Sequence, residues 1–87
     1  MFQAVKNRDL PTIKKLAEDE PHLVTEVNNK LETPLHWAVK IQDKEIIKFL
    51  CSFYASVHAK DINGETPMTI VDKNRWFDLE VLLDKYS

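Results

Sequence analysis

The feature that most constrains this chain is a sequence repeat with a period of 33 residues. The tetrapeptide Glu-Thr-Pro-Leu at 32–35 returns as Glu-Thr-Pro-Met at 65–68, and the same register pairs Leu50 with Leu83. A fixed period of about 20–50 residues is typical of proteins that stack one small structural unit, because neighbouring units bury a core that no single unit can form. The repeat therefore predicts a stacked array.

The N-terminal stretch belongs to the same series at a slightly longer offset. Ala-Val-Lys at 4–6 precedes Ala-Val-Lys at 38–40 by 34 residues. We place the extra residue in the acidic, proline-containing segment 18–21, because loops tolerate insertions better than helices do. The chain is thus predicted to be a single domain, residues 1–87, of three units with approximate boundaries 1–27, 28–60 and 61–87.

Each unit is predicted to contain two short helices. In the middle unit Thr33 suits the N-cap position and Pro34 the first helical position, where its missing N–H costs nothing. His36 follows at the third position, from which a ring nitrogen can reach back to the backbone of Thr33. A break at 41–43 separates this helix from the amphipathic segment 45–50. A connection this short makes the two helices antiparallel neighbours. Since every unit is predicted to consist of two helices and turns, the predicted fold class is all-α.

Composition narrows the partners and the compartment. The chain has 12 Lys and Arg against 14 Asp and Glu, a net charge of −2, which lacks the basic excess typical of nucleic-acid binding. No apolar run approaches the length of a membrane span, about 20 residues. Cys51 is the single cysteine, which fits a reducing compartment. We therefore expect an intracellular, cytoplasmic protein, with the nucleus as the alternative, and no nucleic-acid or membrane partner.

No residue pattern for chemistry stands out. His22, His36 and His58 are scattered and have no Cys or carboxylate at ligand spacing, so we expect no metal. Cys51 has no histidine placed to act as its base, and the chain has no nucleophile motif or phosphate-binding glycine loop. We expect no cofactor, no small-molecule substrate and no enzyme activity.

These residues resemble the ankyrin repeat family, whose unit follows roughly D-x-x-G-x-T-P-L-H-x-A-A-x-x-G-H-x-E-V-V-x-L-L. The match is best at 33–39 and 45–50, and it returns at 61–68. The resemblance covers essentially the whole chain. It implies a helical solenoid of about three helix-turn-helix repeats with hairpin-like turns, and a function in binding another protein.

The chain departs from that pattern at two kinds of position. Arg8, Gln42, Arg75 and Leu31 replace glycines, so these residues are expected to adopt positive φ at a cost of about 1 kcal/mol each. In the last unit, polar residues such as Asp72 replace apolar ones. Such polarity suits the exposed face of a terminal cap, but it also suits a fragment whose last repeat has drifted, and both alternatives stay open.

The resemblance also indicates a binding surface. Trp37 falls at a variable inner-helix position that usually points into the concave groove, which suggests an exposed hot spot with Ile41 and Ile70 extending an apolar floor. The alternative is that Trp37 packs over the adjacent hairpin as part of the core. The predicted partner-binding residues lie on the hairpin tips and inner helices: Lys30, Glu32, Trp37, Lys40, Ile41, Ile62, Asn63, Ile70, Lys73 and Asn74.

The predicted function is therefore a non-enzymatic protein–protein interaction module that recognises a partner of unknown identity. The alternative is a structural or regulatory ankyrin segment of a larger signalling or effector protein, docking intramolecularly. Fold analogy supports binding only as a class of function.

Overall fold

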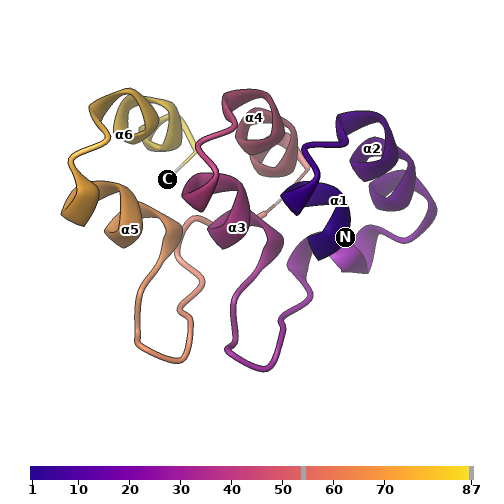
Figure 1. Ribbon diagram of the computed structural model, residues 1–87, viewed down its shortest axis with the longest axis horizontal. Coiled ribbons are helices and arrows are strands. Elements are labelled where there is room, and N and C mark those ends of the chain that lie inside the picture. The colour runs from indigo at the N-terminus through magenta and orange to yellow at the C-terminus, as the bar shows by residue number, and fades with distance from the viewer. Residues whose placement is uncertain (54, 87) are drawn as a thin grey trace.

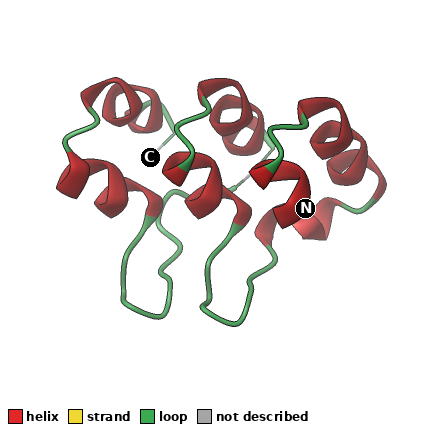
Figure 2. Ribbon diagram, viewed as in Figure 1, coloured by secondary structure: helices red, strands yellow, loops and turns green. Residues whose placement is uncertain are grey.

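The computed structural model describes residues 1–53 and 55–86, and this part of the chain consists of helices and turns without strands (Figure 2). The α-helices form three antiparallel pairs, and the pairs stand side by side in a row (Figure 1). In chain order the elements are α1 (Phe2–Lys6), α2 (Leu10–Asp19), the 3₁₀ helix η1 (Pro21–Thr25), α3 (Pro34–Lys40), α4 (Lys44–Ser52), α5 (Pro67–Asn74) and α6 (Phe77–Asp84).

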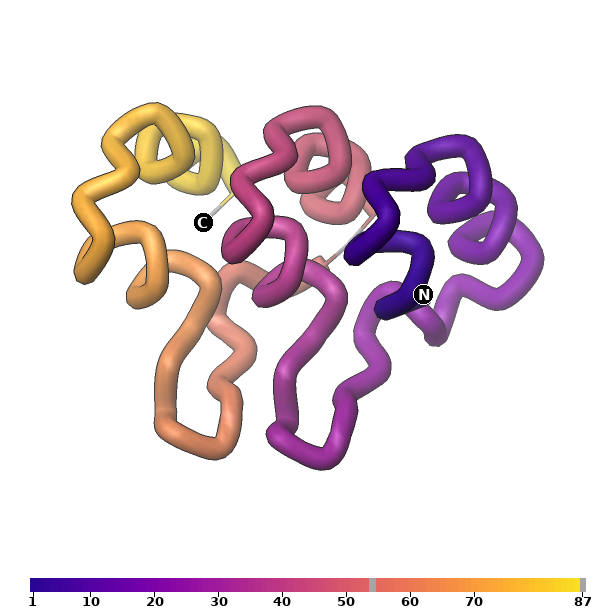
Figure 3. The backbone as a smooth tube through the Cα atoms, viewed as in Figure 1, coloured from indigo at the N-terminus to yellow at the C-terminus, as the bar shows by residue number. Residues whose placement is uncertain are grey.

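The three pairs form two layers. Helices α1, α3 and α5 make the inner layer, and α2, α4 and α6 make the outer layer. Two long loops, which we call the first hairpin (26–33) and the second hairpin (59–66), project from the inner layer on the side away from the outer helices, as the tube trace in Figure 3 shows. The predicted all-α ankyrin-type solenoid is confirmed.

Side-chain caps explain where α2, α3, α4 and α5 begin. Thr33 accepts a hydrogen bond from the His36 N–H at the start of α3, and Asp43 accepts from the first turn of α4. Pro34 occupies the first turn of α3, as predicted, where no N–H is needed. The His36 side chain completes a capping box because its Nδ1 accepts from the Thr33 backbone N–H at 3.0 Å.

The turns between paired helices have left-handed backbone at non-glycine residues. Arg8, Gln42 and Arg75 each have φ of 56°, and Leu31 in the first hairpin has φ of 58°. All four positions were predicted from missing glycines, and the prediction is confirmed. Gly64, at the equivalent place in the second hairpin, has φ of 77° and no Cβ to oppose it. The chain therefore keeps the turn geometry without the residue that suits it best.

Hydrogen bonds join successive repeats. His36 is fully buried, and since its Nδ1 accepts from Thr33, its Nε2 carries the proton and donates to the Glu65 carbonyl oxygen at 2.9 Å. Arg8 donates from Nη2 to the carbonyl oxygen of Ile41 at 2.8 Å. These bonds tie each repeat to the next one in the stack.

The core is continuous from repeat to repeat. Three positions in each repeat carry side chains that are buried in the first two repeats and polar in the last. They hold Val5, Ile13 and Ala17 in the first repeat, Val39, Ile47 and Cys51 in the second, and Asp72, Glu80 and Asp84 in the third.

Candidate protein-interaction surface

The candidate site is the surface formed by α1, α3, α5 and the two hairpins, which we call the inner surface. Helix α3 packs against both α1 and α5. Equivalent residues of successive repeats therefore lie next to one another along this surface. The hairpins lie side by side and are joined by a hydrogen bond from the Ile62 N–H to the Lys30 carbonyl oxygen at 2.9 Å. The inner surface is therefore one connected surface across all three repeats.

Each hairpin is held by one side chain at its base. Asn28 Oδ1 accepts from the backbone N–H groups two and four residues later at 2.9 Å each, and Asp61 Oδ1 does the same in the second hairpin. These bonds fix the tips, which expose large apolar side chains. Leu31 is 48% exposed and Ile62 63% exposed. Apolar side chains on a rigid projecting turn can contact a partner with little loss of chain entropy on binding.

Two lysines lie close to the ring of Trp37. The Nζ atoms of Lys6 and Lys40 stand 4.4 and 5.1 Å from its ring centroid, which is the range of a cation–π contact. The indole is half-buried and packs against the core. Within the described residues its buried Nε1 makes no hydrogen bond of normal geometry, but it is near enough to the Glu32 carboxyl group to help lower the pKa of that group. The expectation that Trp37 is exposed is therefore wrong, because lysine side chains and the adjoining core cover much of the ring. Its role as a binding hot spot stays a prediction.

Glu32 is an internal link rather than a free tip residue. It is only 4% exposed, forms an ion pair with Lys40, and accepts from Asn28 Nδ2 at 3.0 Å. Burial would raise the pKa of its carboxyl group, but hydrogen bonds from Lys40 and Asn28 and the positive charge of Lys40 outweigh it, so the pKa lies below its ordinary value. The structure thus places Glu32, which was predicted to contact a partner, in a buried position with its carboxylate already paired, and its partner-binding role stays a prediction.

Ile70 is also buried. It is 3% exposed within the contiguous core because α5 packs on α3, so the expected apolar floor does not extend to this residue. Ile41 is half-buried against the same core. The other predicted residues are exposed on the inner surface: Lys30, Lys40, Ile62, Asn63, Lys73 and Asn74.

The prediction missed two residues that the structure brings to this surface. Leu31 was noted only as a replaced glycine, yet it is the apolar tip of the first hairpin. Lys6 was left out, although it lies over Trp37. The sequence repeat could have predicted Lys6, because the matching Ala-Val-Lys segments make it the equivalent of Lys40.

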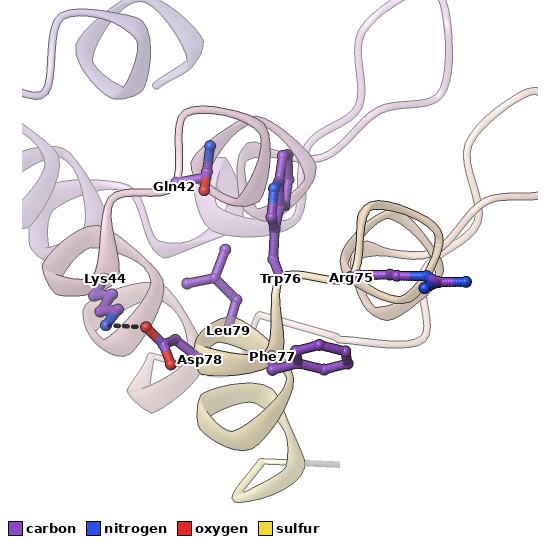
Figure 4. Close-up of a pocket in the computed structure, with 7 residues that line it drawn as sticks. All are labelled: Gln42, Lys44, Arg75, Trp76, Phe77, Asp78 and Leu79. Carbon is purple, nitrogen blue, oxygen red and sulfur yellow. Dashed lines mark hydrogen bonds and ion pairs between the residues drawn. The ribbon is translucent and has the colours of Figure 1, made fainter.

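The opposite end of the helix pairs carries a shallow hollow of about 280 Å³ between the middle and last repeats (Figure 4). An ion pair between Lys44 and Asp78, at 3.4 Å, crosses its edge, while the side chains of Arg75 and Phe77 point away from it. Ligand sites usually have volumes of about 300–1,000 Å³ with convergent polar groups. This hollow gives no support for a small-molecule site.

The remaining reactive groups do not form a chemical site. Cys51 is buried, and burial raises the pKa of its thiol to about 11, so the nucleophilic thiolate is scarcely present near neutral pH. Within residues 1–53 and 55–86, no three His, Cys, Asp or Glu side chains come together in a way that could hold a metal ion. None of the helices described there has the length and apolar character needed to cross a membrane.

Comparison with known proteins agrees with this architecture. The model of the family described as "Ankyrin repeats (3 copies)" matches residues 1–85. The chain therefore belongs to the ankyrin repeat family, whose fold is generally non-catalytic and serves as a general protein–protein interaction module. The predicted resemblance is confirmed.

The chain is similar to one curated relative and, in its fold, to one solved structure. It is 35% identical over 66 residues to the Caenorhabditis elegans protein "BRCA1-associated RING domain protein 1", a match over 76% of this chain and 9% of the relative. A solved structure, "Crystal Structure of EF0377 an Ankyrin Repeat Protein", superposes with a TM-score of 0.89 at 23% identity, covering 99% of this chain and 46% of that one. The chain thus spans a small part of the curated relative and about half of the solved one.

Proposed function

We propose that this chain is a non-enzymatic binding module that recognises another protein with its inner surface. The observation that carries the proposal is the pair of apolar hairpin tips, Leu31 and Ile62, which are 48% and 63% exposed and held next to each other by the hydrogen bond between the hairpins. Exposed apolar side chains beside a polar and charged fringe are the composition of a protein interface. Lys30 and Asn63 supply that fringe.

The experiment is affinity capture of partners from the source cell with matched variants. Leu31→Ser with Ile62→Ser removes the apolar tips, and Phe77→Ser with Val81→Ser removes two residues of similar exposure, 66% and 64%, from α6 on the outer layer. We expect the hairpin variant to lose a partner that the α6 variant retains. Loss only in the α6 variant would move the site to the outer layer and contradict the proposal.

A second candidate function is favoured by the length comparison. Because the chain spans 9% of the curated relative and 46% of the solved structure, it also fits a structural or regulatory ankyrin segment that docks within a larger protein. The natural length of the gene product and binding of flanking segments supplied as separate peptides distinguish the two. Under this alternative, the flanking peptides bind the inner surface and no separate protein is captured.

The remaining parts of the proposal concern chemistry and compartment. We infer no cofactor and no catalytic role, which is consistent with the raised pKa of the Cys51 thiol. The single unpaired cysteine supports a reducing intracellular setting, the cytoplasm or the nucleus. Fractionation of the tagged protein in the source cell tests the compartment.

A further inference from the structure

Charge is distributed unevenly between the two layers. The inner part of the chain, residues 1–8, 26–42 and 58–75, contains seven Lys and Arg against five Asp and Glu, a net charge of +2. The outer part, residues 9–25, 43–57 and 76–87, contains five against nine, a net charge of −4. The overall charge of −2 therefore hides a molecule with a positive inner side.

Burial increases this polarity at the surface. The Lys and Arg residues of the inner part are all exposed. Two of its carboxylates are buried instead, since Glu32 is 4% exposed and Asp61 is 8% exposed, and each accepts hydrogen bonds inside its hairpin. A partner approaching the inner surface can therefore contact its positive groups more readily than its carboxylates.

Three lysines form a row along this surface. Lys6, Lys40 and Lys73 are the last residues, or lie in the last turn, of α1, α3 and α5, at equivalent places in the three repeats. Lys6 and Lys40 are held over the same Trp37 ring. Lys40 and Lys73 each contact a hairpin carboxylate, from Glu32 and Glu65, but an ammonium group has three N–H donors and can donate to a second carboxylate at the same time.

We propose that the inner surface selects an acidic, extended segment of its partner, with carboxylates facing the row of Lys6, Lys40 and Lys73. Neighbouring packed helices lie roughly 8–10 Å apart, and an extended chain advances about 3.3 Å per residue. The row therefore matches a peptide with an acidic residue at about every third position. This inference rests on the proposed function, because it names the chemistry of the partner for the same surface.

An acidic peptide fits better than a nucleic acid. The phosphate backbone of a long nucleic acid would extend beyond the three lysines toward the outer side of the molecule. That side has a net charge of −4 and repels phosphate groups. A short acidic segment is confined to the row. Binding of nucleic acid is accordingly an outcome that the experiment has to distinguish.

The experiment measures fluorescence anisotropy of labelled twelve-residue peptides with the complete chain. One peptide has Asp or Glu at every third position among neutral residues, and its counterpart has Lys at those positions. The inner variant Lys6→Gln with Lys73→Gln leaves Lys40 in place, so buried Glu32 keeps its partner. The matched outer variant Lys14→Gln with Lys48→Gln removes the same charge from α2 and α4.

We expect the acidic peptide to bind, to bind more weakly as salt is raised, and to lose at least fivefold in affinity with the inner variant but less than twofold with the outer one. Equal loss in both variants, equal binding of the lysine peptide, no binding up to millimolar concentration, or tighter binding of a twelve-residue thymidine oligonucleotide would each overturn the inference. Equal melting temperatures of the two variants exclude unfolding as the cause.

The same variants separate this inference from the proposed function. Suppose that the variant Leu31→Ser with Ile62→Ser loses a natural partner, while the inner lysine variant captures as much of that partner as the wild type does. The proposal of an acidic segment is then wrong, and the proposed binding function stands. If capture depends on neither set of residues, the inner surface is not the site and both proposals fail.

Discussion

The middle and last repeats share one register and one backbone path, but they differ in what they present to the side facing away from the first repeat. The middle repeat buries Val39, Ile47 and Cys51 there, while the last has Asp72, Glu80 and Asp84 at the same positions. The local signals that form a repeat, its Thr-Pro cap and its turn, are therefore separate from the signals that let another repeat stack on it.

The hydrogen bonds differ in the same way. In the middle repeat His36 completes the cap and also donates to the Glu65 carbonyl oxygen of the next repeat at 2.9 Å. In the last repeat Thr69 stands at the position of His36, and the hydrogen bonds described for it stay within the helix start: its hydroxyl lies 2.9 Å from that of Thr66. A helix start can thus be kept while the inter-repeat contact is absent.

The largest expected effect comes from exchanging the stacking residues. Ile47→Glu places a charge at a fully buried position, and we expect it to cost more than about 4 kcal/mol and to unfold much of the chain. Glu80→Ile, the reverse change on the half-buried side of the last repeat, should change the free energy of unfolding by about 0.5 kcal/mol or less. Urea unfolding followed by circular dichroism measures both. Similar losses in the two variants would break the distinction between the repeats.

The second exchange concerns the helix starts. His36→Thr gives the middle repeat the residue of the last one, so a hydroxyl can remain near the cap while the bond to the Glu65 carbonyl oxygen is lost. We expect a loss of about 1 kcal/mol, because the hydrogen bond between the repeats is lost while the Glu65 carbonyl oxygen keeps the bond from the Asp61 N–H.

In a domain of this size each kcal/mol lowers the melting temperature by roughly 4–8 °C. Thr69→Ala, which removes only a local, exposed contact, should lower it far less. Equal melting temperatures for the two variants would mean that the inter-repeat bond contributes nothing.

The prediction of the fold succeeded because its signals are local. A Thr-Pro pair at a fixed period, apolar spacing and a missing glycine each act within a few residues, and together they gave the three helix pairs and the left-handed backbone of Arg8, Leu31, Gln42 and Arg75. The unit boundaries at 27/28 and 60/61 stay predictions. So does the partner-binding role of the predicted surface residues.

The prediction of the surface was less accurate because exposure depends on residues far away in the sequence. Lys6 covers Trp37 from a helix 31 residues earlier, and no pattern near Trp37 indicates this. Ile70 is buried by packing between repeats, whereas Trp37, at the equivalent position, is only half-buried. Equivalent positions in a repeat thus share a backbone geometry but not a solvent exposure.

The hairpins allow a smaller test of the same comparison, since Leu31 and Gly64 occupy equivalent left-handed positions. Leu31→Gly should stabilise the chain by an amount on the order of 1 kcal/mol, because it relieves the strain of a side chain at φ of 58°. Gly64→Ala should lose about as much, and since a Cβ there meets no atom within 4 Å, the loss comes from the backbone alone. Thermal unfolding of both variants gives the signs, and a destabilised Leu31→Gly would show that the leucine side chain compensates for its strain.

The smallest effect is a difference in pH dependence between two carboxyl groups, Glu32 beside the middle repeat and Glu80 in the last. Glu32 has a pKa below its ordinary value of 4.5, so its ionised form stabilises the fold above pH 4.5 and this contribution is lost as the pH falls through the lowered pKa. Desolvation and the nearby charges of Asp72 and Asp84 raise the pKa of Glu80, so its ionised form destabilises the fold at neutral pH and that penalty is absent below 4.5.

Isosteric variants separate the two contributions. At pH 7 Glu32→Gln should therefore unfold at a lower urea concentration than the wild type, and Glu80→Gln at a slightly higher one. Both differences should shrink as the pH is lowered toward 3, because the wild-type carboxyl groups then become neutral as well. Urea midpoints at pH 3, 5 and 7 measure the trend. If Glu80→Gln is destabilising at pH 7, the ionised carboxyl group of Glu80 stabilises the last repeat despite the repulsion from its acidic neighbours. The middle and last repeats then differ in packing but not in the effect of their carboxyl groups on stability.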